Sequence, residues 1–583
     1  MSSNQKSTLG LPSNLSLDSL REILGYFKND RATLYSLLFV NYHWCKIVIP
    51  LLWRQPFDMA SLEDYDLIIE TYICCLPEKE KSRFILAGVK LPHHPTPFFN
   101  YPKYLRSYNS SKFRQALNSW LKMNVADCGF DPLNILCKPI KMLFGPIVKD
   151  RYNVMPRSIL HKVVNKCIEP IVQDYCATRP NFDVAKEMRN LLLSGCDRLR
   201  SLKICYDDDS LSLMEMIDSL CMKNINALRN LQSFELCIRT TMKEDLENGY
   251  EILENIFLKI ARSATNIQNM KIDVPHIHKF PEKVHIALYK MITSQKNLSS
   301  YMSNYCWDSN FSIHSALKNT SLKFLNLWGL THFDDSLVQG LLKWINLETL
   351  ELIGCPSSLI PCEVSCNQLN IKNLKLGDGY ESYPYIKTTL LQMCNKNLQK
   401  LTIEGITSEI IEEITQHCPN ITHLSLCAYQ DISKSLPKLI SNLQNMKVLT
   451  LGHHEKFLFT KSTIDQFTQS IPPSLRYLCL NFNISFDFLK LLLEKSQAKL
   501  YKLELHQSKT YSDKLVNFLI DYAKNQTQIK LYIPPEHFPH PKKKCCLSAA
   551  LEVASLKGLK NASKHKHFDI YYKKDNRNFY NLW

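Results

Sequence analysis

The chain has 583 residues, a net charge of +16, and a composition that is 45% hydrophobic and 22% charged. That composition is typical of a globular protein and excludes wholesale disorder, a collagen-like fibre and a membrane channel. Glycine is scarce, with 15 residues. The sequence contains no GxxxxGK, no GxSxG and no complete Rossmann glycine pattern, so phosphate-loop chemistry is not expected.

The 21 cysteines indicate the compartment. They are odd in number and scattered along the chain. The first ten residues are polar and hold no apolar signal segment, and no apolar run is long enough to cross a bilayer. We therefore expect no membrane association and a reducing compartment, the cytoplasm or the nucleus, where free thiols serve as small core side chains.

Residues 1–10 are predicted to be a flexible N-terminus, and residues 11–57 a small domain of three short helices. The first helix has one apolar face, formed by Leu20, Ile23, Leu24 and Phe27. Asp30 is a candidate N-cap for the second helix, and the third helix is expected to end before Pro50. These two helices carry the apolar residues Leu34, Leu37, Leu38, Trp44 and Ile47. So small a core favours packing on a neighbour or a partner.

The region 58–195 is predicted to be helical and irregular and to lead into repeats. From 196 to 535 the pattern L-x-x-L-x-L recurs, with Ile, Met or Phe replacing some leucines. Clear copies recur every 23 to 29 residues and start at Leu322, Leu347, Ile371, Leu398, Ile421, Met446, Leu475 and Leu500. Looser copies start at Leu199, Leu231 and Ile267, and a poor one starts at Leu298.

Each copy is expected to form a short strand whose last two apolar residues point into a core, because side chains alternate along a strand. The segments between copies favour helix, as the spacing of Ile410, Ile411 and Ile414 indicates. One unit cannot bury its apolar face alone, so the copies are predicted to stack around a continuous core. This stretch resembles leucine-rich repeats of the helix-containing kind.

Residues 536–583 are predicted to be a basic tail or a C-terminal cap. The segment from Lys542 onward contains ten basic and three acidic residues, with aromatic residues between them. Cations and aromatic rings together could hold a nucleic-acid strand. The same aromatics would equally form the core of a cap, which a solenoid requires, so nucleic-acid binding is the less favoured interpretation.

The N-terminal helices resemble an F-box, in the form found in the large fungal F-box/leucine-rich-repeat families. The resemblance rests on Leu11-Pro12, Val40-Asn41-x-x-Trp44 and Leu52-Trp53-Arg54. It implies an α/β leucine-rich-repeat solenoid preceded by a small three-helix F-box domain. The function it implies is that of a non-catalytic substrate receptor in a Skp–cullin–F-box ubiquitin ligase. The F-box would dock on the Skp-type adaptor, and through it on a cullin, while the repeats bind a target protein.

The resemblance also implies which residues contact the adaptor. They are Leu11, Pro12, Ile23, Leu24, Leu34, Leu38, Val40 and Trp44. The alternative is that several of them, such as Ile23, Leu24, Leu38 and Trp44, form the core of the domain itself. Leu11-Pro12 also lies four residues earlier than the family pattern places its Leu-Pro. A repeat scaffold without a ligase role is therefore the second interpretation.

The target protein is expected to bind the concave face of the solenoid, which is lined by the residues that flank each inward pair. The candidate residues are Trp328, Glu351, Lys375, Lys400, His423, Tyr477, Lys502 and His506. Trp and Tyr are typical interface anchors, and the lysines and histidines suit an acidic or phosphorylated target. No cofactor is predicted.

Metal and catalytic sites are weaker alternatives. Cysteine and histidine pairs occur at Cys362-x-x-x-Cys366, His276-x-His278 and His453-His454, but no CxxC or HExxH motif is present. Tetrahedral zinc needs four convergent ligands, and no local signature supports a catalytic Cys–His pair. The sequence therefore predicts neither a metal site nor an enzyme.

Overall fold

The computed structural model describes most of the chain between residues 17 and 532, in two compact units that comprise residues 1–322 and 323–583. The described ranges are 17–86, 89–92, 96–125, 184–206, 225–239, 250–274, 280–304, 316–317, 321–329, 335–354, 368–377, 384–453, 460–482, 484–506, 513–525 and 530–532. Leu11, Pro12 and the predicted segments 1–10 and 536–583 lie outside them. Each unit is described by itself.

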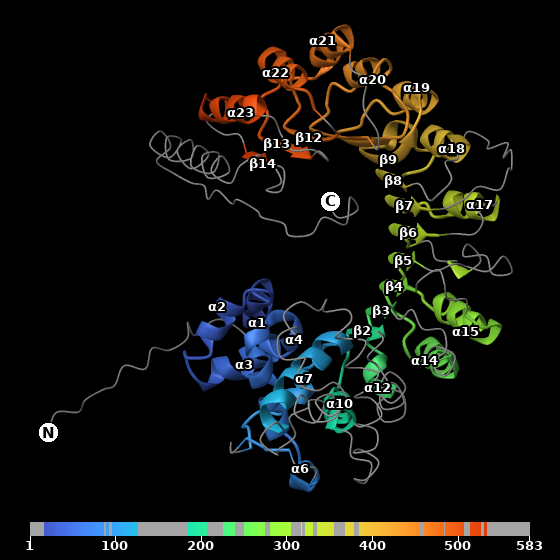
Figure 1. The fold of residues 1–583 in the computed structure, drawn as a ribbon. Helices are drawn as coiled ribbons and strands as arrows, with labels where there is room; N and C mark the ends of the chain where they lie inside the picture. Colours follow the sequence, from blue (N-terminus) through green and yellow to red (C-terminus); the bar gives the residue numbers. More distant parts are fainter. Residues whose placement is uncertain are drawn as a thin grey trace, which may run out of the picture. The chain divides into compact units, whose positions relative to one another are not determined.

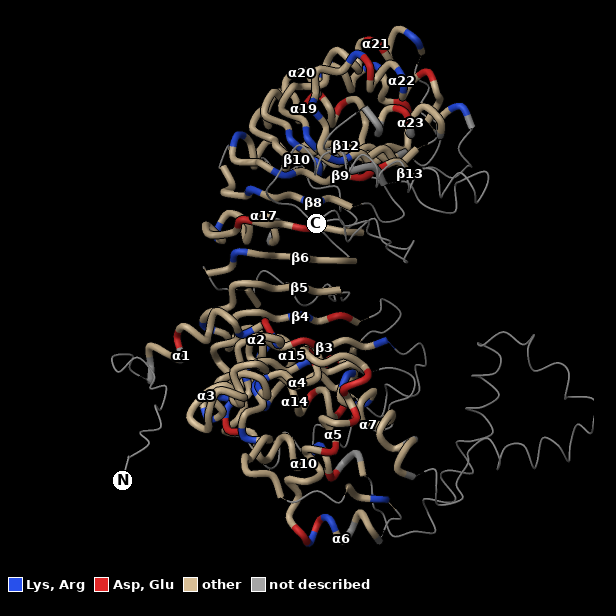
Figure 2. The backbone as a smooth tube through the Cα atoms, turned by 90° about the vertical axis from the view of Figure 1, so that its left-hand side faces the viewer, with Lys and Arg blue, Asp and Glu red and all other residues tan. Residues whose placement is uncertain are grey.

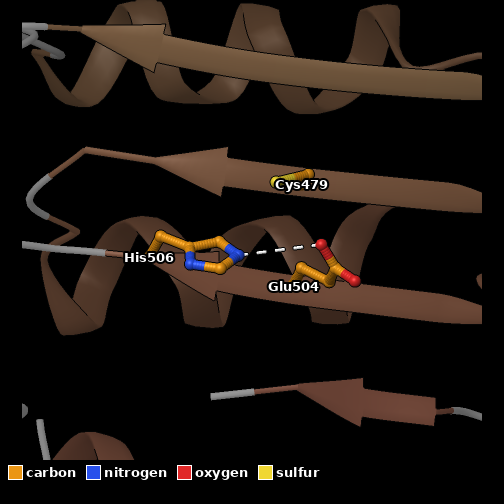
Figure 3. Close-up of side chains that lie close together, drawn as sticks. All are labelled: Cys479, Glu504 and His506. Carbon is orange, nitrogen blue, oxygen red and sulfur yellow. Dashed lines mark ion pairs between the residues drawn. The ribbon is translucent and has the colours of Figure 1, made fainter. Parts of the chain in front are cut away.

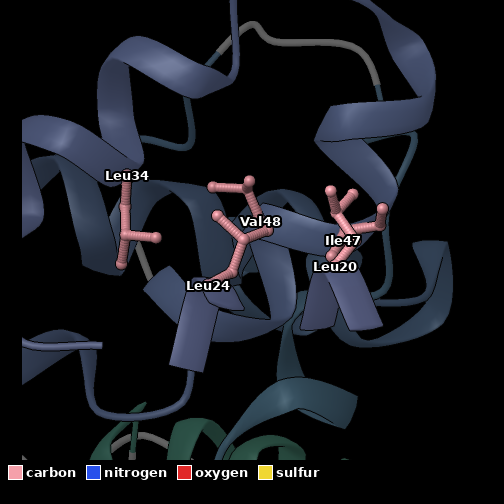
Figure 4. Packing of buried hydrophobic residues seen from close by; sticks show 5 residues of the cluster. All are labelled: Leu20, Leu24, Leu34, Ile47 and Val48. Carbon is pink, nitrogen blue, oxygen red and sulfur yellow. The ribbon is translucent and has the colours of Figure 1, made fainter. Parts of the chain in front are cut away.

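Unit 1 begins with three helices, α1 (Leu17–Tyr26), α2 (Arg31–Leu37) and α3 (Tyr42–Leu52). Residues 17–54 are called the helical module below. Figure 4 shows side chains from all three helices meeting in its core, which consists of Leu20, Leu24, Leu34, Ile47 and Val48. The predicted N-cap is confirmed, because Asp30 Oδ1 accepts the Thr33 amide at 3.1 Å.

The end of the third helix differs from the prediction. Helix α3 does not stop before Pro50 but runs through it to Leu52. A proline inside a helix removes one backbone hydrogen bond. Here the last turn is retained by the Trp53 amide, which donates to the Ile49 carbonyl at 2.9 Å. The Trp53 ring then packs against Tyr72 and Tyr101, with ring centroids 5.2 and 4.2 Å away.

The region predicted as a linker contains ordered helices and already enters the sheet. Its elements are α4 (Pro56–Met59), η1 (Leu62–Asp64), α5 (Tyr65–Cys74), α6 (Glu78–Leu86), η2 (Tyr101–Tyr104), β1 (Ser107–Asn109), α7 (Ser110–Val125) and α10 (Val184–Gly195). Strand β1 pairs in parallel with β2 (Ser201–Tyr206), so the strand ladder starts about 90 residues before the first predicted copy.

The ladder of unit 1 continues in chain order through β3 (Ser233–Ile238), β4 (Asn269–Asp273) and β5 (Ser300–Asn304), all parallel. The connections contain helices α12 (Ile225–Leu228), α14 (Tyr250–Ser263) and α15 (Glu282–Thr293). The looser copies therefore form strands, and so does the poor copy at Leu298.

A repeated backbone contact joins neighbouring strands just before each one begins. The Arg106 carbonyl accepts the amides of Arg200 and Ser201 at 2.8 and 3.0 Å. The Arg54 carbonyl accepts the amides of Arg106 and Ser107 in the same way, at 2.7 and 2.9 Å. Arg54, the last residue of the helical module, thus takes the place that a preceding repeat would occupy.

Unit 2 continues the same construction with nine parallel strands in chain order among its described residues. They are β6 (Phe324–Trp328), β7 (Thr349–Ile353), β8 (Asn373–Gly377), β9 (Lys400–Ile406), β10 (His423–Ala428), β11 (Val448–His453), β12 (Tyr477–Asn481), β13 (Lys502–His506) and β14 (Lys530–Tyr532). The helices are α17 (Asp335–Lys343), α18 (Pro384–Cys394), α19 (Ser408–His417), α20 (Leu436–Asn442), α21 (Lys461–Ser470), α22 (Phe486–Lys495) and α23 (Asp513–Asn525). Figure 1 shows these helices on one face of the strands.

The core of unit 2 lies between its strands and its helices. The inward leucines of successive strands are register partners, as Leu424, Leu449 and Leu478 illustrate, and all three are buried. Ile410, Ile411 and Ile414 are buried on α19, as predicted. Sequential parallel strands with helices on one face form the leucine-rich-repeat arrangement, so the α/β repeat fold is confirmed.

Candidate functional site

The strand face of unit 2 is the face that its helices leave uncovered (Figure 1). Because the strands are in register, its outward residues form rows that run across the sheet. The middle row consists of Asn326, Glu351, Lys375, Thr402, Ser425, Thr450, Cys479 and Glu504. Figure 2 shows that β6 carries no charged residue. The first charged residue of this face in chain order is therefore Glu351 on β7.

The eight predicted target-binding residues all lie at outward positions of this face, in three different rows. Lys400 is exposed, and the other seven are half-buried. Lys400 and His423 are register partners at the start of β9 and β10. Trp328 lies at the end of β6, and its register partner on β7 is Ile353. Whether any of them binds a target stays a prediction.

Three of the predicted residues, Tyr477, Lys502 and His506, converge on Glu504. The Tyr477 hydroxyl donates to Glu504 Oε2 at 2.6 Å, and Lys502 Nζ lies 2.5 Å from Oε1. His506 Nε2 lies 3.7 Å from Oε2, and Figure 3 shows the imidazole ring directed along β13 toward this carboxylate. The Lys502 ammonium also lies 4.9 Å from the centre of the Tyr477 ring.

The surroundings set the ionisation of this cluster. Burial alone would raise the pKa of the Glu504 carboxyl, but its contacts with His506, Lys502 and Tyr477 lower it to about 2. Glu504 is therefore a carboxylate although its side chain is only 7% exposed. Burial, together with the neighbouring Glu504 charge, raises the pKa of the Cys479 thiol to about 12, so this thiol is neutral.

Sequence reasoning placed Glu504 on the concave face but did not single out Cys479 beside it. Both occupy the central outward position of their repeats, in Leu478-Cys479-Leu480 and Leu503-Glu504-Leu505. Residues at this position are register partners on neighbouring strands, as Cys479 and Glu504 are. A comparison of that single position across consecutive copies would have placed the thiol beside the carboxylate.

Two further pairs of side chains lie elsewhere on the strand face: Lys400 with His423, and Asn326 with Glu351. Burial lowers the pKa of His423, and the neighbouring Lys400 and Lys447 lower it further. Asn326 Nδ2 donates to Glu351 Oε2 across β6 and β7. Glu351 and Glu504 are thus both hydrogen-bonded within this face.

The outward face of unit 1 carries a comparable charged network. Glu235 Oε1 lies 2.9 Å from Lys203 Nζ and 3.3 Å from Lys271 Nζ. In the next row, Cys205 and Cys237 are register partners, and Arg239 Nε donates to Cys237 Sγ at 3.4 Å. The Cys205 thiol and then Arg239 hold the pKa of Cys237 below its ordinary value, against the effect of burial.

The structure separates the predicted adaptor contacts by burial. Leu24 and Leu34 are 3% and 0% exposed, so they belong to the core of the helical module, as the alternative interpretation had it. Leu38 and Trp44 are half-buried against that core. Ile23 and Val40 are 45% and 54% exposed and are available to a partner.

Sequence analysis did not anticipate how many other large apolar side chains the helical module exposes. Besides Ile23 and Val40, the exposed ones are Tyr26, Phe27, Tyr35, Phe39 and Tyr42. The Tyr35 and Phe39 rings pack edge to face at 5.3 Å. This group of seven is called the apolar surface of the module; its members lie on α1, on α2, in the turns that follow them and at the first residue of α3.

Several other predicted features lie wholly or partly outside the described residues. They include the pairs Cys362/Cys366 and His276/His278, residue His454, and the basic segment from Lys542 onward. Among the described helices, none combines the length and the hydropathy that a membrane crossing requires. The described cysteines are all free thiols.

Comparisons with known proteins identify no family for this chain. No protein-family model matches the chain, and no curated protein does so either. Among solved structures, the chain is similar to the leucine-rich-repeat-containing protein LegL7 from Legionella pneumophila. That match has 13% identity and a TM-score of 0.28, and covers 55% of this chain and 96% of the other. A likeness this distant carries no weight for function, and the fold assignment rests on the strand registers and the repeat spacing.

Proposed function

We propose that the chain is the substrate-recognition subunit of a Skp–cullin–F-box ubiquitin ligase. The helical module would dock on the Skp-type adaptor, and the strand face would hold a target protein. The chain itself would catalyse nothing. Its contribution would be proximity, because a tethered target reacts with the ligase's other subunits at a high effective concentration.

The observation that carries this proposal is the apolar surface of the module. Monomeric proteins seldom concentrate large exposed apolar side chains, yet a module of three short helices exposes seven of them. Tyr26 is 84% and Phe39 is 74% exposed. Phe39 directly precedes the V-N-x-x-W element that resembles an F-box, where a helical partner surface is expected.

The test is binding of the full chain to a purified Skp-type adaptor. Val40→Asp and Ile23→Asp place a charge on the apolar surface of the module without entering its core. We expect the wild-type chain to bind and each variant to lose at least about tenfold in affinity, because an unpaired charge would be desolvated in the interface.

A matched control uses exposed apolar residues outside the module. Leu62 and Leu67 are 69% and 63% exposed on η1 and α5, so Leu62→Asp and Leu67→Asp should leave adaptor binding unchanged. Circular dichroism of every variant would verify folding. Absence of adaptor binding by the folded wild-type chain would contradict the proposal.

A repeat scaffold without a ligase role is the second candidate. The burial of Leu24 and Leu34 favours it, since two residues implied as adaptor contacts are unavailable on the surface. The strand face would then act alone as a protein-binding surface. The two candidates separate cleanly, because a scaffold would retain target binding but show no affinity for the adaptor.

A further inference from the structure

Three side chains on β12 and β13 combine the donor types that bind transition metals. They are the Cys479 thiol, the Glu504 carboxylate and the His506 imidazole, and their ligand atoms all lie within 4.8 Å of one another. Figure 3 shows Cys479 on one strand, with Glu504 and His506 on the next. Parallel pairing holds them there, because Cys479 and Glu504 are register partners.

We propose that Cys479, Glu504 and His506 form a binding site for a borderline-soft divalent cation, of which Zn²⁺ fits best. Sulfur, nitrogen and oxygen donors together are characteristic of zinc, whereas Mg²⁺ and Ca²⁺ prefer oxygen alone. The site goes beyond the proposed function and does not depend on it, since binding of the cation requires neither adaptor nor target.

The distances suit a small tetrahedral ion. Zinc lies about 2.0–2.3 Å from such donors, which places two nitrogen or oxygen ligands about 3.4 Å apart. The 3.7 Å between His506 Nε2 and Glu504 Oε2 is already close to that value. Cys479 Sγ lies within 4.8 Å of both other ligand atoms, so small side-chain adjustments would bring the three donors around one ion.

The groups around Glu504 fit the role of supporting partners. Lys502 Nζ contacts Oε1, which leaves Oε2 to face the imidazole. The Tyr477 hydroxyl donates to Oε2, and a carboxylate oxygen can accept a second contact. Ligating carboxylates are commonly hydrogen-bonded in this way, which fixes their orientation.

The charges of the surrounding side chains are compatible with a bound divalent cation. Zinc binds cysteine as a thiolate, so the thiol proton passes to the buffer on binding. Thiolate and Glu504 carboxylate then neutralise the dication. The Lys502 ammonium, with its side chain 39% exposed, keeps part of its hydration. Three protein ligands leave a fourth coordination position, which water would fill.

The experiment titrates the reduced full chain with Zn²⁺ under chelator-buffered conditions and with Co²⁺ as a spectroscopic probe. The test variants are Cys479→Ser and His506→Gln. Matched controls on the same face are Cys427→Ser and His423→Gln on β10. They remove a thiol and an imidazole of the same strand face that do not belong to the cluster.

We expect one tight Zn²⁺ site and a thiolate–Co²⁺ charge-transfer band in the wild-type chain and in both controls. Each test variant should lose the band, and its affinity should fall by more than the roughly 10–100-fold that removal of an outer-shell partner costs. Melting curves without metal establish that each variant is folded. If the buried Cys479→Ser change unfolds the chain, His506→Gln decides, because the side chain of His506 is 31% exposed. Wild-type affinity in folded His506→Gln would overturn the proposal.

Discussion

The helical module and the repeat strands of unit 2 distribute their apolar side chains in opposite ways. The module buries five residues in its core and exposes seven large apolar ones. Strands β6 to β13 bury both inward apolar residues of each copy, as Leu350, Leu352, Leu503 and Leu505 show, and carry most of their polar groups at outward positions. Such a division suggests that the strands owe their stability to one another, whereas the module has apolar area left for a partner.

The largest effect should follow from a cavity in the repeat core. Leu449→Ala on β11 removes a fully buried side chain whose register partners are Leu424 and Leu478. We expect a loss of about 3–5 kcal/mol in the stability of unit 2, measured by urea unfolding, because neighbouring strands cannot collapse into the gap. A loss below about 1 kcal/mol would show that the strands are not mutually supporting.

A smaller effect is expected on the strand face. Lys502→Met removes the cation beside the buried Glu504 carboxylate. Because the Lys502 side chain is partly solvated, the expected loss is about 1–2 kcal/mol in the same unfolding experiment. Lys400→Met, at an exposed position in the same row, is the control and should change little. Equal effects from both variants would mean that the Glu504 cluster contributes nothing specific.

Within the module, removal of the N-cap of α3 should lower stability by less than the two changes above. Asn41 Oδ1 accepts the Trp44 amide at 3.1 Å, and Asn41→Ala removes this bond at a cost of about 1 kcal/mol. Amide hydrogen exchange in α3 reports the change locally and should accelerate there. Asn29→Ala, in the turn before the Asp30 cap, serves as the comparison and should leave exchange in α3 unaltered.

The smallest effect on stability should come from the apolar surface of the module. Phe39→Ser replaces a ring that is 74% exposed. The free energy of unfolding should therefore change by no more than about 0.5 kcal/mol, as for an ordinary surface substitution. The melting temperature should then stay close to that of the wild-type chain. Under the proposed function the same variant weakens adaptor binding. A large drop in melting temperature would instead assign Phe39 to the fold and remove it from the docking surface.

Periodicity predicted the repeat strands well because the spacing of the leucines is a direct requirement of the fold. It failed at the first strand of unit 1 and at the last described strand of unit 2. Strand β1 carries Tyr108 where the pattern has leucine, and β14 is preceded by polar residues, so neither matched. In the module, helical spacing placed Leu20, Ile23 and Leu24 on one face, yet three short helices cover only part of that face.

The candidate site was predictable only in part. The outward positions follow from strand alternation, and all eight predicted residues occupy them. Which of them meet depends on the register between strands, and the connections that set this register vary in length from repeat to repeat. The contact of Cys479 on β12 with Glu504 on β13 is therefore a property of strand pairing, which follows from aligning the central positions of the two repeats and not from either segment alone.

The Arg54 carbonyl has a consequence for any truncation experiment. Through its two hydrogen bonds with Arg106 and Ser107, the helical module closes the first edge of the β1–β5 ladder. A repeat array needs a terminal cap, and an open strand edge invites pairing with another chain. A chain shortened to begin at residue 58 would expose β1 and tend to associate with itself. Insolubility of such a fragment would report an uncovered sheet edge and would carry no information about the adaptor.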